Sequence, residues 1–166
     1  MNRFIFFVAV FLPVIGFCQS NDSTFKPRYS IIINSDNRKL MLNQCSREVP
    51  LNESGFWNLS NGDIQILENN FKKIIPLKVD GCCIEGKEMP DIKSYTVQYA
   101  GLIINGKKFI YMNAFYTPSG MNIDKEYRDW KTTPVSVCDG GDDFWGGLFN
   151  IGNLEFSKLK ANAPGG

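Results

Sequence analysis

The feature that most constrains the fold of this chain is a two-residue turn in the middle of its longest β-rich stretch. Asn105-Gly106 separates the runs Tyr95–Ile104 and Lys107–Phe115, which are rich in β-branched and aromatic residues. A type I′ turn needs a positive φ at both central residues, and Asn followed by Gly accepts this readily. The sequence therefore predicts a long antiparallel hairpin whose register is fixed by the turn.

This register assigns every side chain of the hairpin to one of two faces. Both faces are fairly apolar, so we expect the hairpin to lie in the centre of a sheet, with other elements packed on both sides. The predicted pairs are Gln98 with Asn113, Ala100 with Tyr111 and Leu102 with Phe109 on one face, and Val97 with Ala114, Tyr99 with Met112 and Gly101 with Ile110 on the other.

One amphipathic helix is predicted upstream of the hairpin. Ser60 is a good N-cap, and Asp63 three residues later gives a near capping box. Pro76 ends the helix. Apolar residues recur at the spacing of one helical face, namely Ile64, Leu67, Phe71, Ile74 and Ile75. One face of this helix is therefore expected to lie on an apolar surface.

The remaining β-rich segments complete the predicted fold. Tyr29–Ile33 and Lys39–Asn43 are expected to form a short hairpin around a polar turn. Gly146 and Gly147 are expected to mark a bulge or the close approach of another backbone. Further strands are predicted at Thr133–Cys138, Phe144–Ile151 and Leu154–Leu159. This order predicts an α+β fold, with one helix packed on an antiparallel sheet of about four to five strands, and it resembles the cystatin-like arrangement.

The start of the chain has the pattern of a secretory signal peptide. Arg3 precedes the apolar run Phe4–Phe17, and small residues before a cleavage site end at Cys18. A spanning helix needs about 20 apolar residues, and this run is shorter and contains Pro13. We therefore expect a signal peptide at residues 1–18 rather than a membrane anchor.

Cleavage after Cys18 gives the expected domain organisation. A single α+β domain is predicted at 19–166, with flexible ends at 19–28 and 161–166. Its expected location is the periplasm or the exterior of a bacterial cell. Lipidation of Cys18 would instead give an outer-membrane lipoprotein. No later segment of the sequence has the length and hydropathy of a transmembrane helix.

The composition excludes several classes of function. The chain has 18 basic and 17 acidic residues, and this near balance disfavours binding to nucleic acid. It has no histidine, which removes Ser-His-Asp catalysis, Cys-His catalysis and histidine-ligated zinc. The sequence contains neither a nucleophile elbow nor a phosphate-binding loop. We therefore expect a protein that is not an enzyme and that carries no cofactor.

The cysteines beyond the leader are interpreted as two disulfides. They are Cys45, Cys82, Cys83 and Cys138. Because adjacent cysteines rarely bond to each other, Cys82 and Cys83 are expected to pair with Cys45 and Cys138, in an order that the sequence leaves open. The alternative, a redox or metal-binding thiol site, lacks a C-x-x-C motif.

Three stretches of the second half resemble a known group of proteins. They are QYAGLIINGKKFIYMNAF at 98–115, WKTTPVSVCDGG at 130–141 and DFWG at 143–146. Together they are similar to a group of small exported bacterial proteins of unknown function that share NGKKxIYxNAF and VCDGGxxFWG. The resemblance implies an exported single domain, and it implies no activity.

Two sets of residues near the C-terminal half are candidates for a site. Asp139, Asp142 and Asp143 place three carboxylates close together, as a hard cation such as calcium would require. The spacing is not that of an EF-hand, so we interpret these residues as a turn. The second set is aromatic, and Phe144, Trp145 and Trp130 are candidate contacts to a partner.

These observations favour an exported, non-enzymatic binding domain. The predicted partner is another protein, as for a protein inhibitor or a toxin-neutralising protein. The alternative is a small-ligand or carbohydrate binder of the cell envelope, with a pocket between the helix and the sheet. An enzyme with a carboxylate or metal centre is a third hypothesis, and the oligomeric state stays open.

Overall fold

The predicted hairpin forms the centre of the fold in a computed structural model of the chain. Strands β5 (Tyr95–Ile104) and β6 (Lys107–Tyr116) pair antiparallel in the predicted register. Asn105 and Gly106 have φ values of 50° and 73°, both positive as a type I′ turn requires. The prediction of the hairpin and its register is therefore confirmed.

The structure describes residues 25–33, 36–48, 50, 53–81, 84–88 and 91–165. The predicted signal peptide at 1–18, with the candidate lipidation residue Cys18, lies outside these residues. Cys82 and Cys83 lie outside them as well.

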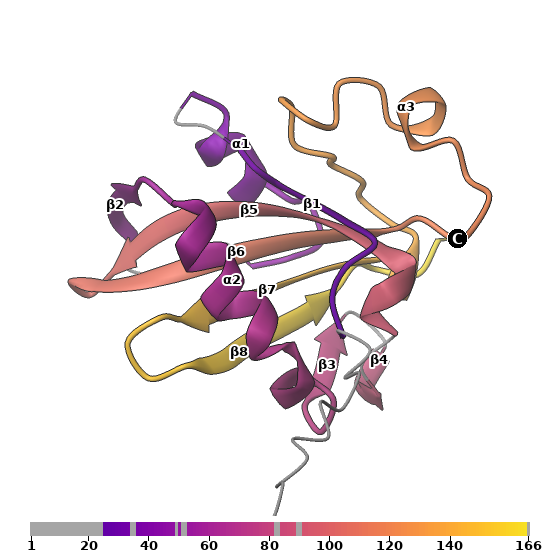
Figure 1. Ribbon diagram of the computed structural model, residues 1–166. Coiled ribbons are helices and arrows are strands. Elements are labelled where there is room, and N and C mark those ends of the chain that lie inside the picture. The colour runs from indigo at the N-terminus through magenta and orange to yellow at the C-terminus, as the bar shows by residue number, and fades with distance from the viewer. Residues whose placement is uncertain are drawn as a thin grey trace, which may run out of the picture.

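The strands form one eight-stranded sheet of mixed direction. The hydrogen-bonded order is β1-β5-β6-β7-β8-β3-β4, and β2 also pairs with β5 (Figure 1). β1 is parallel to β5 and β3 is parallel to β8, whereas the other pairs are antiparallel. The shorter strands are β1 (Tyr29–Ile32), β2 (Glu53–Trp57), β3 (Lys78–Gly81), β4 (Ile84–Glu88), β7 (Phe144–Asn150) and β8 (Glu155–Ala161).

Short helical elements connect these strands. Among the described residues they are the α-helices α1 (Arg38–Leu42), α2 (Asn61–Asn69) and α3 (Ile123–Glu126), and the 3-10 turns η1 (Phe71–Ile74), η2 (Ile92–Ser94) and η3 (Gly141–Asp143).

The predicted fold class is wrong in its architecture. The protein has an eight-stranded mixed sheet with three short α-helices in its described part, instead of one helix on four to five antiparallel strands in a cystatin-like arrangement. The segment 39–43 lies mostly in helix α1, so the expected N-terminal hairpin does not form and β1 pairs with β5. The segment 133–138 contains no strand. β2, β3 and β4 are only four or five residues long, and glycine and charged residues weaken their strand pattern.

The predicted helix start is confirmed, and the helix is shorter than expected. The backbone N–H of Asp63 donates to the Ser60 hydroxyl, and the backbone N–H of Ser60 donates to the Asp63 carboxylate at 2.8 Å. α2 ends at Asn69, and η1 continues the path in tighter turns. Most of the predicted apolar stripe is buried, but Ile75 is 53% exposed because it lies beyond η1.

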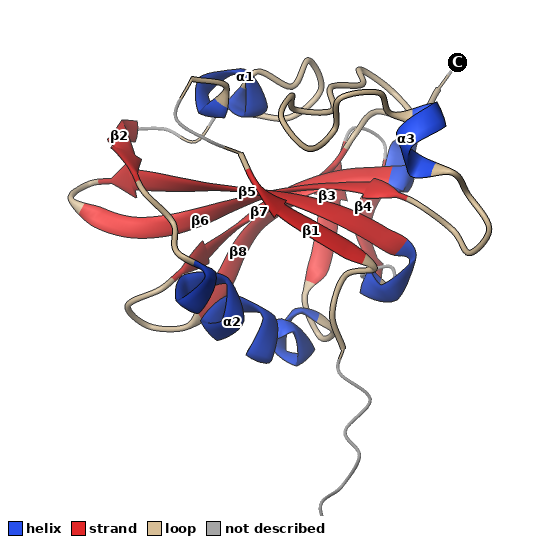
Figure 2. Cartoon of the chain, turned by 45° about the horizontal axis from the view of Figure 1, so that its top comes forward, coloured by secondary structure: helices blue, strands red, loops and turns tan. Residues whose placement is uncertain are grey.

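Different elements cover the two faces of the sheet (Figure 2). α2 and η1 lie on one side, which we call the helix face. α1 and the segment 117–140, which contains α3, lie on the other side. We call the segment 117–140 the strap and this side the strap face. The helix face holds the larger apolar core, whereas the strap face holds two smaller apolar clusters.

Candidate functional site

A pocket of about 290 Å³ lies on the strap face, near the turn of the central hairpin. Its floor is made by side chains of the sheet, and most of these are apolar. They are Ile104, Phe109, Tyr111 and Leu148. The walls come from the segment before β2, with Arg47, Glu48 and Pro50, and from β8, with Ser157, Lys158 and Lys160. A cavity near 300 Å³ with an apolar floor and few polar groups suits a small organic ligand.

Arg47 is the unusual residue of this pocket, because its charged side chain is buried and makes few hydrogen bonds. Its side chain is 6% exposed. Nη2 donates a hydrogen bond of 2.7 Å to Oδ1 of Asn113, a residue of β6. Nη1 and Nε are buried and have no hydrogen bond among the described residues. A buried guanidinium is normally paired with a carboxylate, so this arrangement leaves unused binding capacity beside the pocket.

Arg47 interacts electrostatically with a second polar group of the pocket, the phenol of Tyr111. Burial lowers the pKa of Arg47, and the charge interaction with Tyr111 acts in the opposite direction. Burial raises the pKa of the Tyr111 phenol, and the Arg47 charge opposes that shift. The phenol therefore remains protonated at neutral pH, while arginine keeps its charge in proteins. Both groups can act as hydrogen-bond donors.

Gly146 makes room for these two donors. A Cβ atom at this position would lie 2.9 Å from the Tyr111 hydroxyl and within overlap distance of Arg47 Nη1. Any side chain at position 146 would therefore displace one or both groups. The sequence predicted a bulge or the close approach of another backbone at Gly146 and Gly147. The pairing with β8 does shift between Gly146 and Leu148, but side chains make the closest approach to Gly146.

A β-bulge shapes the opposite wall. The pairing of β7 with β8 shifts between Gly146 and Leu148, and Lys158 in the bulge has a φ of 55°. The extra residue interrupts the alternation of β8, so Ser157, Lys158 and Lys160 all line the pocket. A positive φ is uncommon for lysine, and such conformations concentrate at functional sites.

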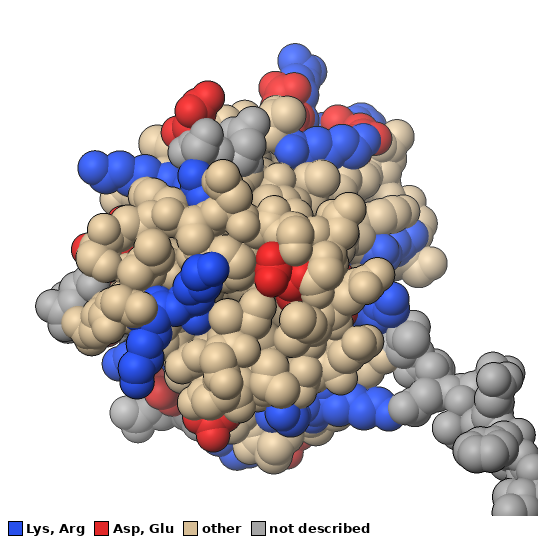
Figure 3. All heavy atoms as spheres, turned by 60° about the vertical axis from the view of Figure 1, so that its left-hand side comes forward, with Lys and Arg blue, Asp and Glu red and all other residues tan. Residues whose placement is uncertain are grey.

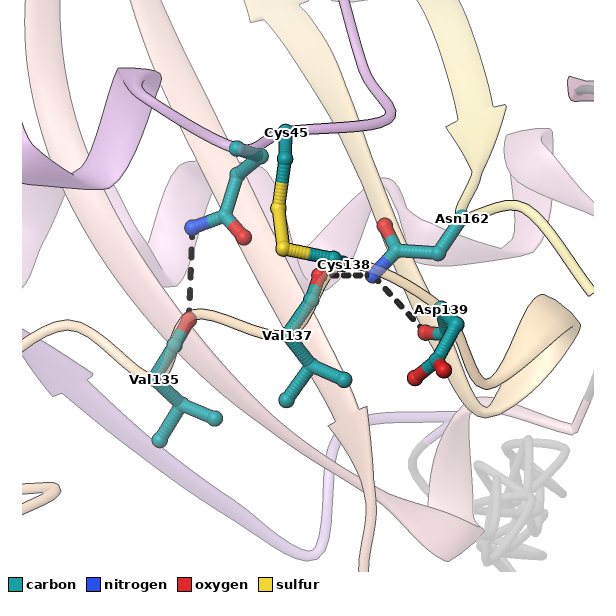
Figure 4. The surroundings of a disulfide bond; sticks show 7 residues. Cys45, Val135, Val137, Cys138, Asp139 and Asn162 are labelled. Carbon is teal, nitrogen blue, oxygen red and sulfur yellow. Dashed lines mark hydrogen bonds between the residues drawn. A yellow bond between two sulfur atoms is a disulfide. The ribbon is translucent and has the colours of Figure 1, made fainter. Parts of the chain in front are cut away.

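The disulfide holds the Arg47 segment against the strap. Cys45 is bonded to Cys138, which joins the segment after α1 to the end of the strap (Figure 4). Nε2 of Gln44 adds a hydrogen bond of 3.3 Å to the carbonyl oxygen of Val135. The expected pairing of these cysteines with Cys82 and Cys83 is therefore wrong for the two described cysteines, because both Cys45 and Cys138 lie on segments that cross the same face of the sheet.

The aromatic residues predicted to bind a partner do not share one exposed surface. Trp145 is completely buried in the helix-face core, where its ring contacts Tyr95. Trp130 is 5% exposed, and its indole N–H donates to Asp124 at 2.9 Å. The remaining ring, that of Phe144, is half-buried against Tyr127. The two tryptophans therefore contribute to packing on opposite faces of the sheet.

The three aspartates predicted as a turn lie in η3 and just before it. Asp142 and Asp143 belong to η3, and Asp139 precedes it by two residues. Gly140 adopts a φ of 88°, which is the backbone conformation that the turn needs. Within the described ranges, no cluster of three or more acidic or cysteine side chains is arranged to hold a metal ion.

Sequence reasoning missed Arg47, although one signal pointed to this region. The hairpin register placed Gln98 opposite Asn113, and two amides facing each other on central strands require buried polar partners. The identity of those partners depends on the strap and on the disulfide, which join segments far apart in the sequence. The sequence alone contains no signal that selects Arg47.

Comparisons with known proteins identify no relative. No protein family matches the chain, and no curated protein or solved structure matches it significantly. None of the helices in the described part of the chain has both the length and the apolar character that a membrane span requires.

Proposed function

We propose that this chain is an exported, non-catalytic binding domain that takes a small, partly apolar ligand in the strap-face pocket. One observation carries this proposal: an apolar floor of about four side chains lies beneath polar walls in a cavity of about 290 Å³. The pattern of a signal peptide at residues 1–18 supports export to the periplasm or the exterior. The disulfide suits an oxidising compartment.

The pocket favours a small ligand over a protein partner. The protein-partner hypothesis relied on exposed aromatic side chains, and Trp145 and Trp130 are buried. On the helix face, α2 lies on a core that includes Leu67, Phe71 and Phe149, all fully buried. The pocket between α2 and the sheet, lined by Ile64 and Tyr99 among others, is smaller, at about 160 Å³. We therefore propose a binding site on the strap face, whereas the small-ligand alternative expected a pocket between the helix and the sheet.

The surface around the hairpin end is consistent with this class of function. Basic and acidic side chains are scattered there among uncharged residues and do not form one basic patch on the part of the face that is described (Figure 3). A nucleic acid would need a continuous positive surface. A small ligand needs only the groups that line its pocket.

The proposal can be tested with an uncharged apolar dye, N-phenyl-1-naphthylamine. The oxidised protein should bind the dye with an increase in fluorescence. Ser157 is an exposed residue of the pocket wall, so Ser157→Trp should fill the pocket and raise the dissociation constant at least about tenfold.

A matched substitution serves as the control. Ser119 is exposed in the loop after β6, at the other end of the hairpin, and is not among the pocket residues. Ser119→Trp should leave dye binding unchanged. No dye binding by the wild-type protein, or equal effects of the two tryptophans, would contradict the proposal.

A further inference from the structure

We propose that the ligand carries a carboxylate, which Arg47 and the Tyr111 hydroxyl bind together while the apolar part of the ligand lies on the pocket floor. This inference rests on the proposed function and specifies the chemistry of its ligand. It assigns Arg47 as the residue that determines specificity.

Arg47 is a buried cation whose hydrogen-bonding capacity is mostly unused. Removing a guanidinium from water is unfavourable unless hydrogen bonds or an anion replace the water. Arg47 has one such bond, from Nη2 to Asn113, while Nη1 and Nε have none among the described residues. A bound anion would explain why a charged side chain occupies this buried position, because it would accept the hydrogen bonds that Arg47 does not make within the protein.

The described part of the protein does not supply this anion itself. No described acidic side chain lies within ion-pair distance of Arg47. Glu48 lines the same pocket, but its side chain is exposed and it is not among the groups that shift the pKa of Arg47. Among the described residues, no carboxylate of the protein therefore neutralises the charge of Arg47.

Two hydrogen-bond donors converge at one end of the pocket. Arg47 Nη1 and the Tyr111 hydroxyl both lie over the Cα of Gly146, where a side chain would collide with them. One guanidinium N–H and one phenol O–H can each donate to one oxygen of a carboxylate. An uncharged alcohol would use fewer of these donors, and a cation would be repelled.

The apolar surface of the pocket lies beside these two donors. Ile104, Phe109 and Leu148 form the floor between the hairpin turn and the Arg47 corner. A ligand whose carboxylate is at Arg47 would place its hydrocarbon part over these side chains. Lys158 and Lys160 line the opposite wall, where they add positive charge without being buried as Arg47 is.

The test compares three ligands of equal chain length: decanoate, 1-decanol and decyltrimethylammonium. Each is titrated into the oxidised protein carrying N-phenyl-1-naphthylamine, and dye displacement is measured. Decanoate should bind about tenfold or more tightly than decanol, and the ammonium compound should bind most weakly. Equal binding of decanoate and decanol would overturn the inference and leave the proposed function intact. Failure of the dye itself to bind would contradict both.

Two variants separate specificity from structural support. Arg47→Met should remove the preference for decanoate over decanol, and Tyr111→Phe should reduce this preference about 3- to 10-fold because it removes one donor and keeps the ring. Both changes should weaken the binding of decanol less than that of decanoate, because the alcohol uses fewer of these donors. If Arg47→Met fails to fold, Tyr111→Phe still decides the test, since an unchanged preference in that variant would overturn the inference.

A third variant controls for general positive charge. Lys160→Met removes a half-buried cation from the wall of the same pocket and should reduce the preference for decanoate less than twofold. A loss equal to that of Arg47→Met would show that the field of the pocket, rather than the donors of Arg47, selects the ligand. The proposed role of Arg47 would then be wrong.

Discussion

The two faces of the central hairpin bury different kinds of side chain, although the same two strands form both. On the helix face, β5 and β6 contribute Val97, Tyr99 and Met112 to an apolar core, and all three are fully buried. On the strap face, the same strands contribute Gln98 and Asn113, which are equally buried. The extent of burial therefore does not distinguish the faces. They differ in the interactions of the buried side chains, which are apolar contacts on the helix face and hydrogen bonds on the strap face.

On the strap face, the side-chain amide of Gln98 makes four of the hydrogen bonds that pair buried polar groups. Nε2 of Gln98 donates to the carbonyl oxygens of Trp130 and Thr133, at 2.6 and 2.9 Å. Oε1 of Gln98 accepts from the backbone N–H of Val135 at 2.9 Å and from Nδ2 of Asn113 at 3.0 Å. This part of the strap has no strand partner, so these side chains replace the ladder that a strand would have provided.

Buried polar atoms without a hydrogen bond are concentrated in the segment 38–47, which lies beside the strap. Seven buried side-chain polar atoms lack a hydrogen bond among the described residues, and five of them belong to residues 38–47. Apolar burial favours folding wherever it occurs, whereas buried polar groups require specific partners. The helix face therefore contributes mainly stability, and the strap face fixes the positions of a few groups around the pocket.

The largest loss of stability is expected from a truncated side chain in the helix-face core. Phe71 is fully buried and stacks on Phe156, with ring centroids 5.7 Å apart. Phe71→Ala should lower the free energy of unfolding by about 3–5 kcal/mol, through lost burial and the cavity that remains. Chemical denaturation at equilibrium measures this change.

The matched control for this prediction lies on the strap face. Phe109 is half-buried in the pocket floor, so Phe109→Ala should lower the free energy of unfolding by less than half as much. Similar losses for Phe71→Ala and Phe109→Ala would mean that both faces contribute equally to stability, and the comparison would fail.

The difference between the faces also explains what the sequence could predict. The hairpin register follows from a two-residue turn, and the start of α2 follows from Ser60 and Asp63, because these interactions are local. The parallel pairing of β1 with β5 joins Tyr29 to Thr96 across a long stretch of chain, and nothing local specifies it. Local signals therefore predicted the central hairpin and the start of α2, but neither the shorter strands nor the order of the strands in the sheet.

The candidate site could be predicted only in part, because most of its contacts join segments that are far apart in the sequence. Gln98 and Asn113 could be placed opposite each other from the turn, and Gly146 could be marked as a point of close approach. The group that approaches Gly146 is Arg47, which the Cys45–Cys138 link holds in place. A contact between three segments far apart in the chain leaves no periodic pattern in the sequence.

The next largest effect is expected from the disulfide. Replacing Cys45 and Cys138 together by serine opens a link across a sequence separation of 93 residues and should lower the free energy of unfolding by about 2–4 kcal/mol. Hydrogen exchange should show the earliest loss of protection in the strap, with α2 protected until global unfolding. Equal early loss in α2 would contradict the separation of the two faces.

The smallest of these effects, and the most specific to the strap face, is expected from Gln98→Leu. The substitution keeps an apolar volume in the sheet but removes the partners of the Trp130 and Thr133 carbonyls and of the Val135 N–H. Unpaired buried groups of this kind cost about 1–3 kcal/mol, so unfolding should become easier by that amount.

Hydrogen exchange at one amide distinguishes a positioning role for Gln98 from simple packing. In the wild-type protein, the Val135 N–H donates to Oε1 of Gln98, so its protection depends directly on this side chain. Gln98→Leu should speed exchange at Val135 well beyond the change in global stability, whereas Tyr99→Phe, on the opposite face of the same strand, should not. The Tyr99 hydroxyl makes only a long contact of 3.4 Å to Glu68. If Val135 exchanges no faster in Gln98→Leu, the strap is held by its apolar cluster of Phe115, Ile123 and Trp130, and the polar network is secondary.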